Sequence, residues 1–311
     1  MYPALFFILG LLLLLIGSQG VIRNALIIST LTRIPAFVIG VTIVAIGTSL
    51  PEMVVSFFGG LEESPDLALG NIIGSNTANI GLILGISLLL KPIYIGKTKT
   101  QKNMLISLVV SLYLFTTLLI GGLSQLHGLV FVVLGVVVIW WQIIQGKKDG
   151  IIEAPVIKQM INPVLAFSFF SASLVALFIG GKLLVDGGIS IATLFKIPPA
   201  IIGATAVAIG TSIPELAVSV SALLGKTSRD EEKLVIGNIL GSNIFNILFG
   251  AGMLGLFGVK NFTNLVSLYA FLIFSVFFFF LLLIFKGNKI PRYFGFVFLA
   301  VYITYFVFLF K

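Results

Sequence analysis

Two stretches of this chain have nearly the same sequence. Residues 33–52 (RIPAFVIGVTIVAIGTSLPE) and 196–215 (KIPPAIIGATAVAIGTSIPE) are identical at 13 of 20 aligned positions. A second pair follows, with GNIIGSNTANI at 70–80 and GNILGSNIFNI at 237–247. The shared positions are rich in Thr, Ser, Pro, Asn and Glu, which apolar packing does not require. The duplication predicts a fold made of two related halves, each with the same polar motif.

The composition of the chain predicts a membrane protein. Hydrophobic residues make up 59% of the sequence and charged residues 10%, which excludes an ordinary soluble domain. Apolar runs of roughly 17–25 residues, long enough to cross the hydrocarbon core, recur along the whole chain. The first run lacks a basic region and a cleavage site, so we interpret it as a transmembrane helix rather than a signal peptide. We predict an all-α membrane protein with ten transmembrane helices, near residues 3–20, 34–60, 67–90, 103–121, 126–145, 163–184, 198–224, 234–257, 264–285 and 293–310.

The basic residues predict how these helices are oriented. The connections after spans 1, 3, 5, 7 and 9 share one side of the membrane and carry 15 of the 19 Lys and Arg. By the positive-inside rule this side is cytoplasmic, so both termini are predicted to lie outside the cytoplasm, in a plasma-membrane protein. The net charge of +8 is then a topological signal, and we expect no nucleic-acid partner. The 15 residues are Arg23, Arg33, Lys91, Lys97, Lys99, Lys102, Lys147, Lys148, Lys158, Lys226, Arg229, Lys233, Lys286, Lys289 and Arg292.

The spacing of the motifs divides the chain into two halves. The first half, 1–145, carries its motif at 33–80, and the second half, 163–311, carries the copy at 196–247. The segment 146–162 reads as a cytoplasmic linker. Each half has five predicted spans, an odd number, so the second half enters the membrane from the opposite side. We therefore predict two inverted five-helix repeats, with the site at their interface.

Prolines predict a break in spans 2 and 7. Pro51 has no N–H, and its ring crowds the carbonyl of Gly47 one turn earlier, so the helix bends or breaks there. Inside a membrane, backbone groups freed in this way persist only where protein, water or an ion satisfies them. Oxygen-bearing positions follow at spacings of three and four, on one helix face. In span 2 they are Thr42, Ala45, Ser49 and Glu52, and in span 7 the pattern is repeated by Ala208, Thr211, Ser212, Pro214 and Glu215.

Spans 3 and 8 are predicted to form the opposite wall of the site. Each carries two asparagines and a serine at i, i+4 and i+8: Asn71, Ser75 and Asn79, and then Asn238, Ser242 and Asn246. Glycines at 70, 74, 81, 237 and 241 are expected to allow close approach between helices.

The chemistry of this donor set favours hard cations. All contributors are oxygen ligands, without His or Cys, which suits Ca²⁺ or Na⁺ better than zinc or copper. Glu52 and Glu215 together carry a formal charge of −2, which one Ca²⁺ or two Na⁺ would balance. Without cations the two carboxylates would repel and one would tend to take up a proton, so protons should compete for the site at low pH. No organic cofactor is expected.

Most single elements of the motif also have an ordinary structural explanation. Small-residue patterns usually serve packing, a membrane proline is often only a kink, and Asn and Ser often hold helices together. The glutamates differ, because a structural role would require a cationic partner and no span interior contains one. Lys182 and Asp186 are expected to form a salt bridge. The acidic groups 62–66 and 230–232 are expected to be solvated loop charges, with a weaker alternative that they attract cations.

The motif GTS-[LI]-PE followed by G-N-x-x-G-S-N-x-x-N, present twice, resembles the α-repeats of the sodium/calcium exchanger family. This resemblance covers both repeats and implies a compact, prokaryotic-type antiporter that exchanges Ca²⁺ for several Na⁺ and is electrogenic. It implies that Ca²⁺ is held by Glu52, Glu215 and the carbonyls of Thr48 and Thr211. It further implies Na⁺ sites that use the Ala45 carbonyl, Ser49 and Ser75, and the Ala208 carbonyl, Ser212 and Ser242, with Asn79 and Asn246 in the middle.

Other functions stay open at this point. Some relatives that depend on K⁺ carry Asp where this chain has Asn246, and proton-coupled relatives carry Glu and His in these motifs, so both are weaker alternatives. A cation channel could also use a pair of glutamates, although inverted repeats with broken helices favour alternating access. An intramembrane enzyme is disfavoured, because no nucleophile or His accompanies the carboxylates. No obligate protein partner is expected.

Overall fold

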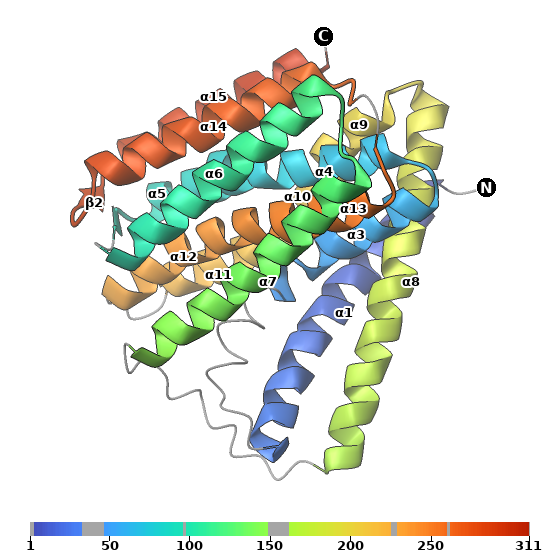
Figure 1. Cartoon of the computed structure of the whole chain (residues 1–311), viewed down its shortest axis with the longest axis horizontal. Helices are drawn as coiled ribbons and strands as arrows, with labels where there is room; N and C mark the ends of the chain where they lie inside the picture. The colour runs from blue at the N-terminus through green and yellow to red at the C-terminus, as the bar shows by residue number, and fades with distance from the viewer. Residues whose placement is uncertain are drawn as a thin grey trace.

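The computed structural model of the chain describes residues 3–32, 47–95, 98–148, 162–224, 229–259 and 262–310. Nearly all of these residues lie in helices, which pack closely together (Figure 1). Within the described ranges the strands are limited to β1 (Ile93–Tyr94) and β2 (Lys289–Ile290), two residues each, which pair antiparallel. The predicted all-α class is confirmed.

The helices follow the chain in two series. The first contains α1 (Pro3–Thr32), α3 (Leu50–Leu61), α4 (Pro65–Ala78), the π-helical turn η1 (Asn79–Ile83), α5 (Leu84–Leu90), α6 (Thr98–Ile120) and α7 (Gln125–Lys148). The second contains α8 (Pro163–Phe195), α9 (Pro199–Ile202), the π-helical turn η2 (Gly203–Val207), α10 (Ala208–Thr211), α11 (Ile213–Leu224), α12 (Arg229–Phe245), the π-helical turn η3 (Asn246–Ala251), α13 (Gly252–Leu256), α14 (Leu265–Ile284) and α15 (Tyr293–Leu309).

The described helices identify a multi-pass membrane protein. Seven helices are long and apolar enough to cross a membrane, and an eighth is reached if the bent pair 199–211 and 213–224 counts as one span. Two shorter apolar helices, α3 and α15, are also present. Residues 33–46, which include the start of the predicted second span, lie outside the described residues. The count of ten spans therefore stays a prediction.

Two helices are longer than the sequence analysis predicted. α1 and α8 end 12 and 11 residues beyond the predicted limits at 20 and 184. Polar side chains near these limits do not stop the helix, since Asn24 Nδ2 donates to a carbonyl one turn earlier in α1. α8 ends only where Lys196 adopts a left-handed backbone (φ 55°, ψ 36°). Arg23 consequently lies within a helix rather than in a connecting loop.

The two segments that carry the Asn motif form the centre of the molecule. In an 18-residue window of residues 65–90 (α4, η1 and α5), and likewise of 235–256 (α12, η3 and α13), 83% of the residues are buried. The corresponding values for 3–21 and 164–195 are 28% and 22%. Polar residues of the motif are therefore carried by the spans that have least contact with the surroundings.

The long helices α1 and α8 lie side by side and project from the rest of the molecule (Figure 1). Glycines lie at their contact points: a Cβ on Gly10 would come within 2.4 Å of the Leu184 backbone nitrogen. A Cβ on Gly17 would come within 2.7 Å of the Leu177 nitrogen. A larger residue at either position would force the two helices apart, so their close packing requires glycine there.

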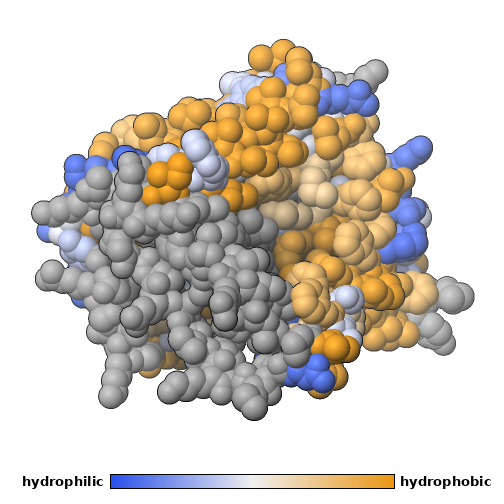
Figure 2. All heavy atoms as spheres, turned by 60° about the horizontal axis from the view of Figure 1, so that its bottom comes forward, coloured by the Kyte–Doolittle hydropathy of each residue, from blue (hydrophilic) through white to orange (hydrophobic). Residues whose placement is uncertain are grey.

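The exterior of the molecule is largely apolar. Large hydrophobic side chains are exposed on most helices, for example Ile120 at 85% and Val164 at 70%. Figure 2 shows hydrophobic residues over most of the coloured surface, with hydrophilic ones in small groups. Soluble proteins rarely expose apolar patches of this extent, whereas a surface in contact with lipid requires them.

One acidic residue expected to be solvated is instead buried. Glu232, in α12, is 3% exposed. Its Oε1 accepts a hydrogen bond from Lys289 Nζ at 2.7 Å, and its Oε2 accepts one from the Tyr94 backbone N–H at 2.8 Å. The expectation was wrong for Glu232, because strands β1 and β2 come from distant parts of the chain and bring their donors to it.

The predicted salt bridge between Lys182 and Asp186 is confirmed, with 3.6 Å between Nζ and Oδ2. Lys182 also forms an ion pair with Glu62, which links α8 to the end of α3. Each of these side chains is at least one-third exposed, so the pair is accessible to solvent or headgroups.

Candidate functional site

The second motif helix is broken at Ser212, two residues before Pro214. The helix axis bends by 41° between 199–211 and 213–224, with Ser212 at the break. Ser212 has φ −86° and ψ 6°, and the matching Ser49 has φ −88° and ψ 3°. These angles lie in the sparsely populated bridge region, where many functional residues are found. The predicted break in span 7 is confirmed, and Ser49 shows the same local backbone at the start of α3.

The two motif glutamates are completely buried. Glu52 lies in the first turn of α3 and Glu215 in the first turn of α11, and both are 0% exposed. Ser212, three residues before Glu215, contacts the Glu52 carboxylate, so the two motifs meet at this point. Among the described residues neither forms an ion pair with a basic side chain, and Oε2 of each has no hydrogen-bond partner. Buried carboxylates without a counter-charge are costly, so the arrangement favours a cation between them.

A serine hydroxyl from the other half of the chain contacts Glu52, and a serine of its own half lies beside it. Ser212 Oγ donates to Glu52 Oε1 at 3.4 Å. Beside it, Ser75 Oγ in α4 lies 3.4 Å from the Ala208 carbonyl oxygen and 3.4 Å from Thr211 Oγ1. The carbonyl of Ala208 also accepts the Ser212 backbone N–H at 3.1 Å, so it is not freed by the break. These contacts bring spans 2, 3 and 7 together.

A matching group surrounds Glu215. Ser242 Oγ in α12 donates to Glu215 Oε1 at 3.2 Å and lies 3.4 Å from Thr48 Oγ1. Ser49 Oγ is 0% exposed and has no hydrogen-bond partner among the described residues. Each carboxylate thus receives one serine hydroxyl, and residues from both halves of the chain contribute to both groups.

The asparagines of the site lie where the helices widen. The π-helical turns η1 and η3 begin at Asn79 and Asn246. Such turns often mark functional sites, because they add a residue to the turn and redirect side chains. Both residues are 0% exposed. Asn79 Oδ1 and both side-chain polar atoms of Asn246 have no hydrogen-bond partner among the described residues, so both amide oxygens are unused acceptors there.

The side chains of the other two predicted asparagines, Asn71 and Asn238, form hydrogen bonds with residues of the span 7 helices. Asn71 Oδ1 accepts from Thr211 Oγ1 at 3.1 Å. Asn238 Nδ2 donates to the Glu215 carbonyl at 3.1 Å and to Ser219 Oγ at 3.1 Å. Repeat-related positions therefore differ in their surroundings.

The eleven described positions of the predicted site share one property: each is at most 3% exposed. They are Thr48, Ser49, Glu52, Ser75, Asn79, Ala208, Thr211, Ser212, Glu215, Ser242 and Asn246. The contacts above link most of them into one buried polar cluster. Ala45, and Thr42 before it, lie outside the described residues.

The sequence analysis missed Asn243, which contacts Asn79 of this cluster, and the backbone carbonyl of Asn76, which contacts Asn243. Asn79 Nδ2 donates to Asn243 Oδ1 at 2.9 Å, and Asn243 Nδ2 lies 3.5 Å from the Asn76 carbonyl oxygen. Both belong to the repeated GSN tripeptide, so the duplication contained the signal. They fall outside the i, i+4 and i+8 stripe, which is why helical spacing alone did not select them.

The donor set of the cluster is chemically uniform. It contains two carboxylates, hydroxyls and carboxamides. In the segments that the structure describes, no group of three or more His, Cys, Asp or Glu residues could hold a metal ion. Hard cations with partly neutral oxygen coordination fit this set, whereas zinc or copper would require other ligands.

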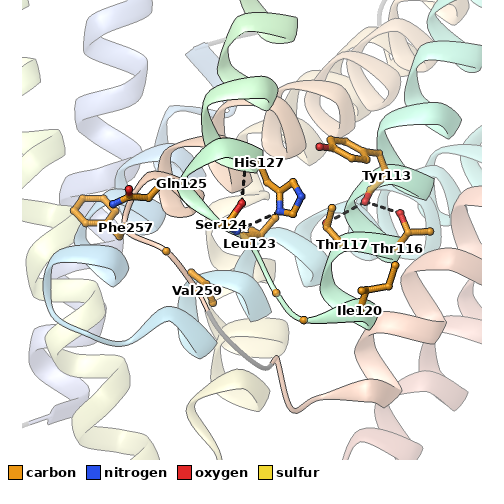
Figure 3. A pocket seen from close by; sticks show the side chains of 13 residues that line it. Tyr113, Thr116, Thr117, Ile120, Leu123, Ser124, Gln125, His127, Phe257 and Val259 are labelled. Carbon is orange, nitrogen blue, oxygen red and sulfur yellow. Dashed lines mark hydrogen bonds between the residues drawn. The ribbon is translucent and has the colours of Figure 1, made fainter.

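A separate pocket of about 660 Å³ lies between the α6–α7 loop and the end of α13, away from the cluster (Figure 3). His127 lies beside it, and its Nδ1 accepts the Ser124 backbone N–H at 3.2 Å, while Ser124 Oγ accepts the His127 N–H at 3.3 Å. This reciprocal pair caps the start of α7. None of the cluster residues lines the pocket.

Comparisons with known proteins cover both halves of the chain. The model of the family described as sodium/calcium exchanger protein matches residues 2–144 and 165–311. Membrane protein MJ0091 of Methanocaldococcus jannaschii is 36% identical over 96% of this chain and 95% of its own length. Sodium/calcium exchanger MaX1 of Methanosarcina acetivorans is 29% identical over 98% of each chain. A structure of the sodium-calcium exchanger NCX_Mj, soaked with 10 mM Na⁺ and 10 mM Sr²⁺, has a TM-score of 0.64 and 34% identity over 98% of both chains.

Proposed function

Because the chain belongs to the sodium/calcium exchanger family, we propose that it is a secondary antiporter that exchanges Ca²⁺ for Na⁺ across the plasma membrane. Several Na⁺ enter for each Ca²⁺ that leaves, so the exchange moves net charge. Transport proceeds by alternating access. The transported ions are the substrates, and the lipid bilayer is the partner of the protein. Transport needs no organic cofactor, no enzymatic reaction and no second protein.

The paired buried carboxylates support this proposal most directly. Glu52 and Glu215 are fully buried and have no basic partners among the described residues. Two negative charges in a membrane interior are balanced by one Ca²⁺ or by two Na⁺, and a third Na⁺ leaves surplus positive charge. A site that can be balanced by either load, but is costly when empty, is suited to exchange.

The proposed ligands come from the two groups of residues around Glu52 and Glu215. Ca²⁺ binds between the carboxylates of Glu52 and Glu215 and the carbonyls of Thr48 and Thr211. Na⁺ binds on either side of it, with Asn79 and Asn246 in the middle. The flanking ligands are the Ala45 carbonyl, Ser49 and Ser75 on one side, and the Ala208 carbonyl, Ser212 and Ser242 on the other.

The architecture that fits this function is a pair of inverted repeats. Residues 1–145 and 163–311 each supply five spans, joined by the cytoplasmic segment 146–162, and both termini lie outside the cytoplasm. Equivalent broken-helix residues then approach the site from opposite sides of the membrane, as alternating access requires. The similar backbone angles at Ser49 and Ser212 support this symmetry.

Two alternatives within the antiporter class remain for experiment. Ca²⁺ transport coupled to K⁺ is less favoured, because position 246 is Asn rather than Asp. Coupling to H⁺ is less favoured because the motifs of spans 3 and 8 contain neither Glu nor His. A channel would conduct either cation down its gradient without exchange.

The proposal is tested by ⁴⁵Ca²⁺ uptake into proteoliposomes loaded with Na⁺, with K⁺ or with a proton gradient. We expect uptake driven by the outward Na⁺ gradient alone, and no uptake in Glu215→Gln or Glu52→Gln. Glu63→Gln is the matched control, because it removes the same charge from an exposed residue in the α3–α4 loop.

Each contrary result has a distinct meaning. If uptake requires K⁺ or a proton gradient, the coupled ion is K⁺ or H⁺ rather than Na⁺. Calcium flux in the absence of any counter-ion gradient would indicate a channel. Uptake that persists in Glu215→Gln would refute the assigned site.

A further inference from the structure

We propose that Asn243 is a positioning residue for the ion site, which turns the carboxamide of Asn79 so that its oxygen, and not its nitrogen, faces the cations. This inference rests on the proposed function, because it concerns how one of the assigned ligands is presented. Asn243 is 2% exposed and lies in α12, whereas Asn79 begins η1, so the contact joins the two halves of the chain.

The orientation of the two amides is set by a backbone group. The Asn76 carbonyl oxygen can only accept a hydrogen bond, and Asn243 Nδ2 is the side-chain atom that faces it, at 3.5 Å. The other end of the Asn243 carboxamide is its oxygen, which faces Asn79 and can only accept. Asn79 therefore donates Nδ2 to it at 2.9 Å. What Asn79 has left to present is Oδ1.

This orientation decides whether Asn79 can bind a cation. A carboxamide presents either an acceptor oxygen or a donor NH₂ group, and the two ends have nearly the same shape. A half-turn about the last side-chain bond would point two N–H donors at the ions without a change in packing. Asn79 Oδ1 has no hydrogen-bond partner among the described residues, which leaves it available as a ligand.

The repeat-related position supplies the contrast. Asn76 and Asn246 occupy the places in the motifs that Asn243 and Asn79 occupy in the other copy. Asn76 Nδ2 donates to the Ile72 carbonyl of its own helix at 2.7 Å. Its Oδ1 has no hydrogen-bond partner among the described residues, and neither does Asn246 Nδ2. Only the Asn79 side of the site therefore has an oriented carboxamide, and Asn76 offers a matched control.

The test measures ⁴⁵Ca²⁺ binding to the purified protein for wild type, Asn243→Leu and Asn76→Leu. Leucine keeps the size of asparagine and removes its hydrogen bonds. Loss of a residue that orients a metal ligand typically lowers metal affinity about 10–100-fold. We expect a loss in that range for Asn243→Leu and less than a threefold change for Asn76→Leu, each measured well below the melting temperature of the variant.

A second comparison separates positioning from a general structural role. In an Asn79→Asp background both ends of the side chain are oxygens, so its orientation no longer matters. Asn243→Leu should then change the Ca²⁺ affinity less than threefold. Asn79→Ala, which has no carboxamide to orient, gives the same comparison without added charge.

The outcomes distinguish this inference from the proposed function. If wild type binds no Ca²⁺ and shows no Na⁺-driven exchange, the proposed function fails. If wild type binds and exchanges, but Asn243→Leu behaves like Asn76→Leu, only the positioning role is overturned. An equal loss from Asn243→Leu in both the wild-type and Asn79→Asp backgrounds would also overturn it, because the effect would not depend on the carboxamide.

Discussion

Replacing Gly70 by alanine tests whether the packing of α4 against α9 and η2 sets the geometry of the site. A Cβ at Gly70 would lie 2.3 Å from the Ala200 carbonyl oxygen and 3.0 Å from the Ala204 nitrogen. Since close C···O contacts are about 3.3 Å or longer, the two segments would have to separate by about 1 Å. Overpacking of this kind costs about 1–3 kcal/mol. It would also move Ser75, in the same helix, away from the Ala208 carbonyl, now 3.4 Å from its Oγ.

The chain contains a matched control for this substitution. Gly237 is the repeat-related residue in α12, but it is exposed, and no atom of the described residues lies within 4 Å of a Cβ built there. Within the described residues, the close packing expected at Gly237 is not present. Gly237→Ala should leave transport unchanged and can stabilise α12 by up to about 1 kcal/mol, because alanine favours helix.

The assay combines melting temperature in detergent with initial rates of Na⁺-driven ⁴⁵Ca²⁺ uptake. A displacement of about 1 Å at a reacting or binding group can lower rates about 100-fold, so Gly70→Ala should be both less stable and severely impaired. Gly203→Ala approaches the same contact from the other side, where its Cβ would lie 2.1 Å from the Leu67 carbonyl oxygen, and should behave alike. If Gly70→Ala melts and transports like Gly237→Ala, the contact does not set the site.

Three further predictions follow from contacts in the structure. Glu232→Ala leaves Lys289 and the Tyr94 N–H without their acceptor and should lower stability by about 1–3 kcal/mol, measured by thermal unfolding, while Na⁺-driven uptake persists; unchanged unfolding would show that this contact contributes nothing. Lys182→Ala should leave melting temperature and uptake unchanged, because exposed ion pairs contribute little; a large loss of uptake would instead implicate α8 in transport through this pair. Acidification should raise the Ca²⁺ concentration needed for half-maximal uptake, because protons compete for the Glu52 and Glu215 oxygens; an affinity independent of pH would contradict this.

Much of the site could be predicted from the sequence, because the chemistry of its residues is unusual for a membrane interior. Glu52 and Glu215 stand out as carboxylates without basic neighbours, and the motif prolines predict the break observed at Ser212. Local sequence could not show that Glu232 is buried, because its partners come from strands far away in the chain. It also could not set the end of α1, because Asn24 satisfies its side chain within the helix and does not stop it.

Duplication of a motif assigns the type of donor at each position but not its surroundings. Gly70 and Gly237 have the same sequence context, yet one contacts a neighbouring backbone and the other faces open space. Asn79 is held by Asn243, whereas Asn246 has no such partner among the described residues. The effect of a substitution in one repeat therefore cannot be transferred to the other, and each member of a repeat pair is the most informative control for its counterpart.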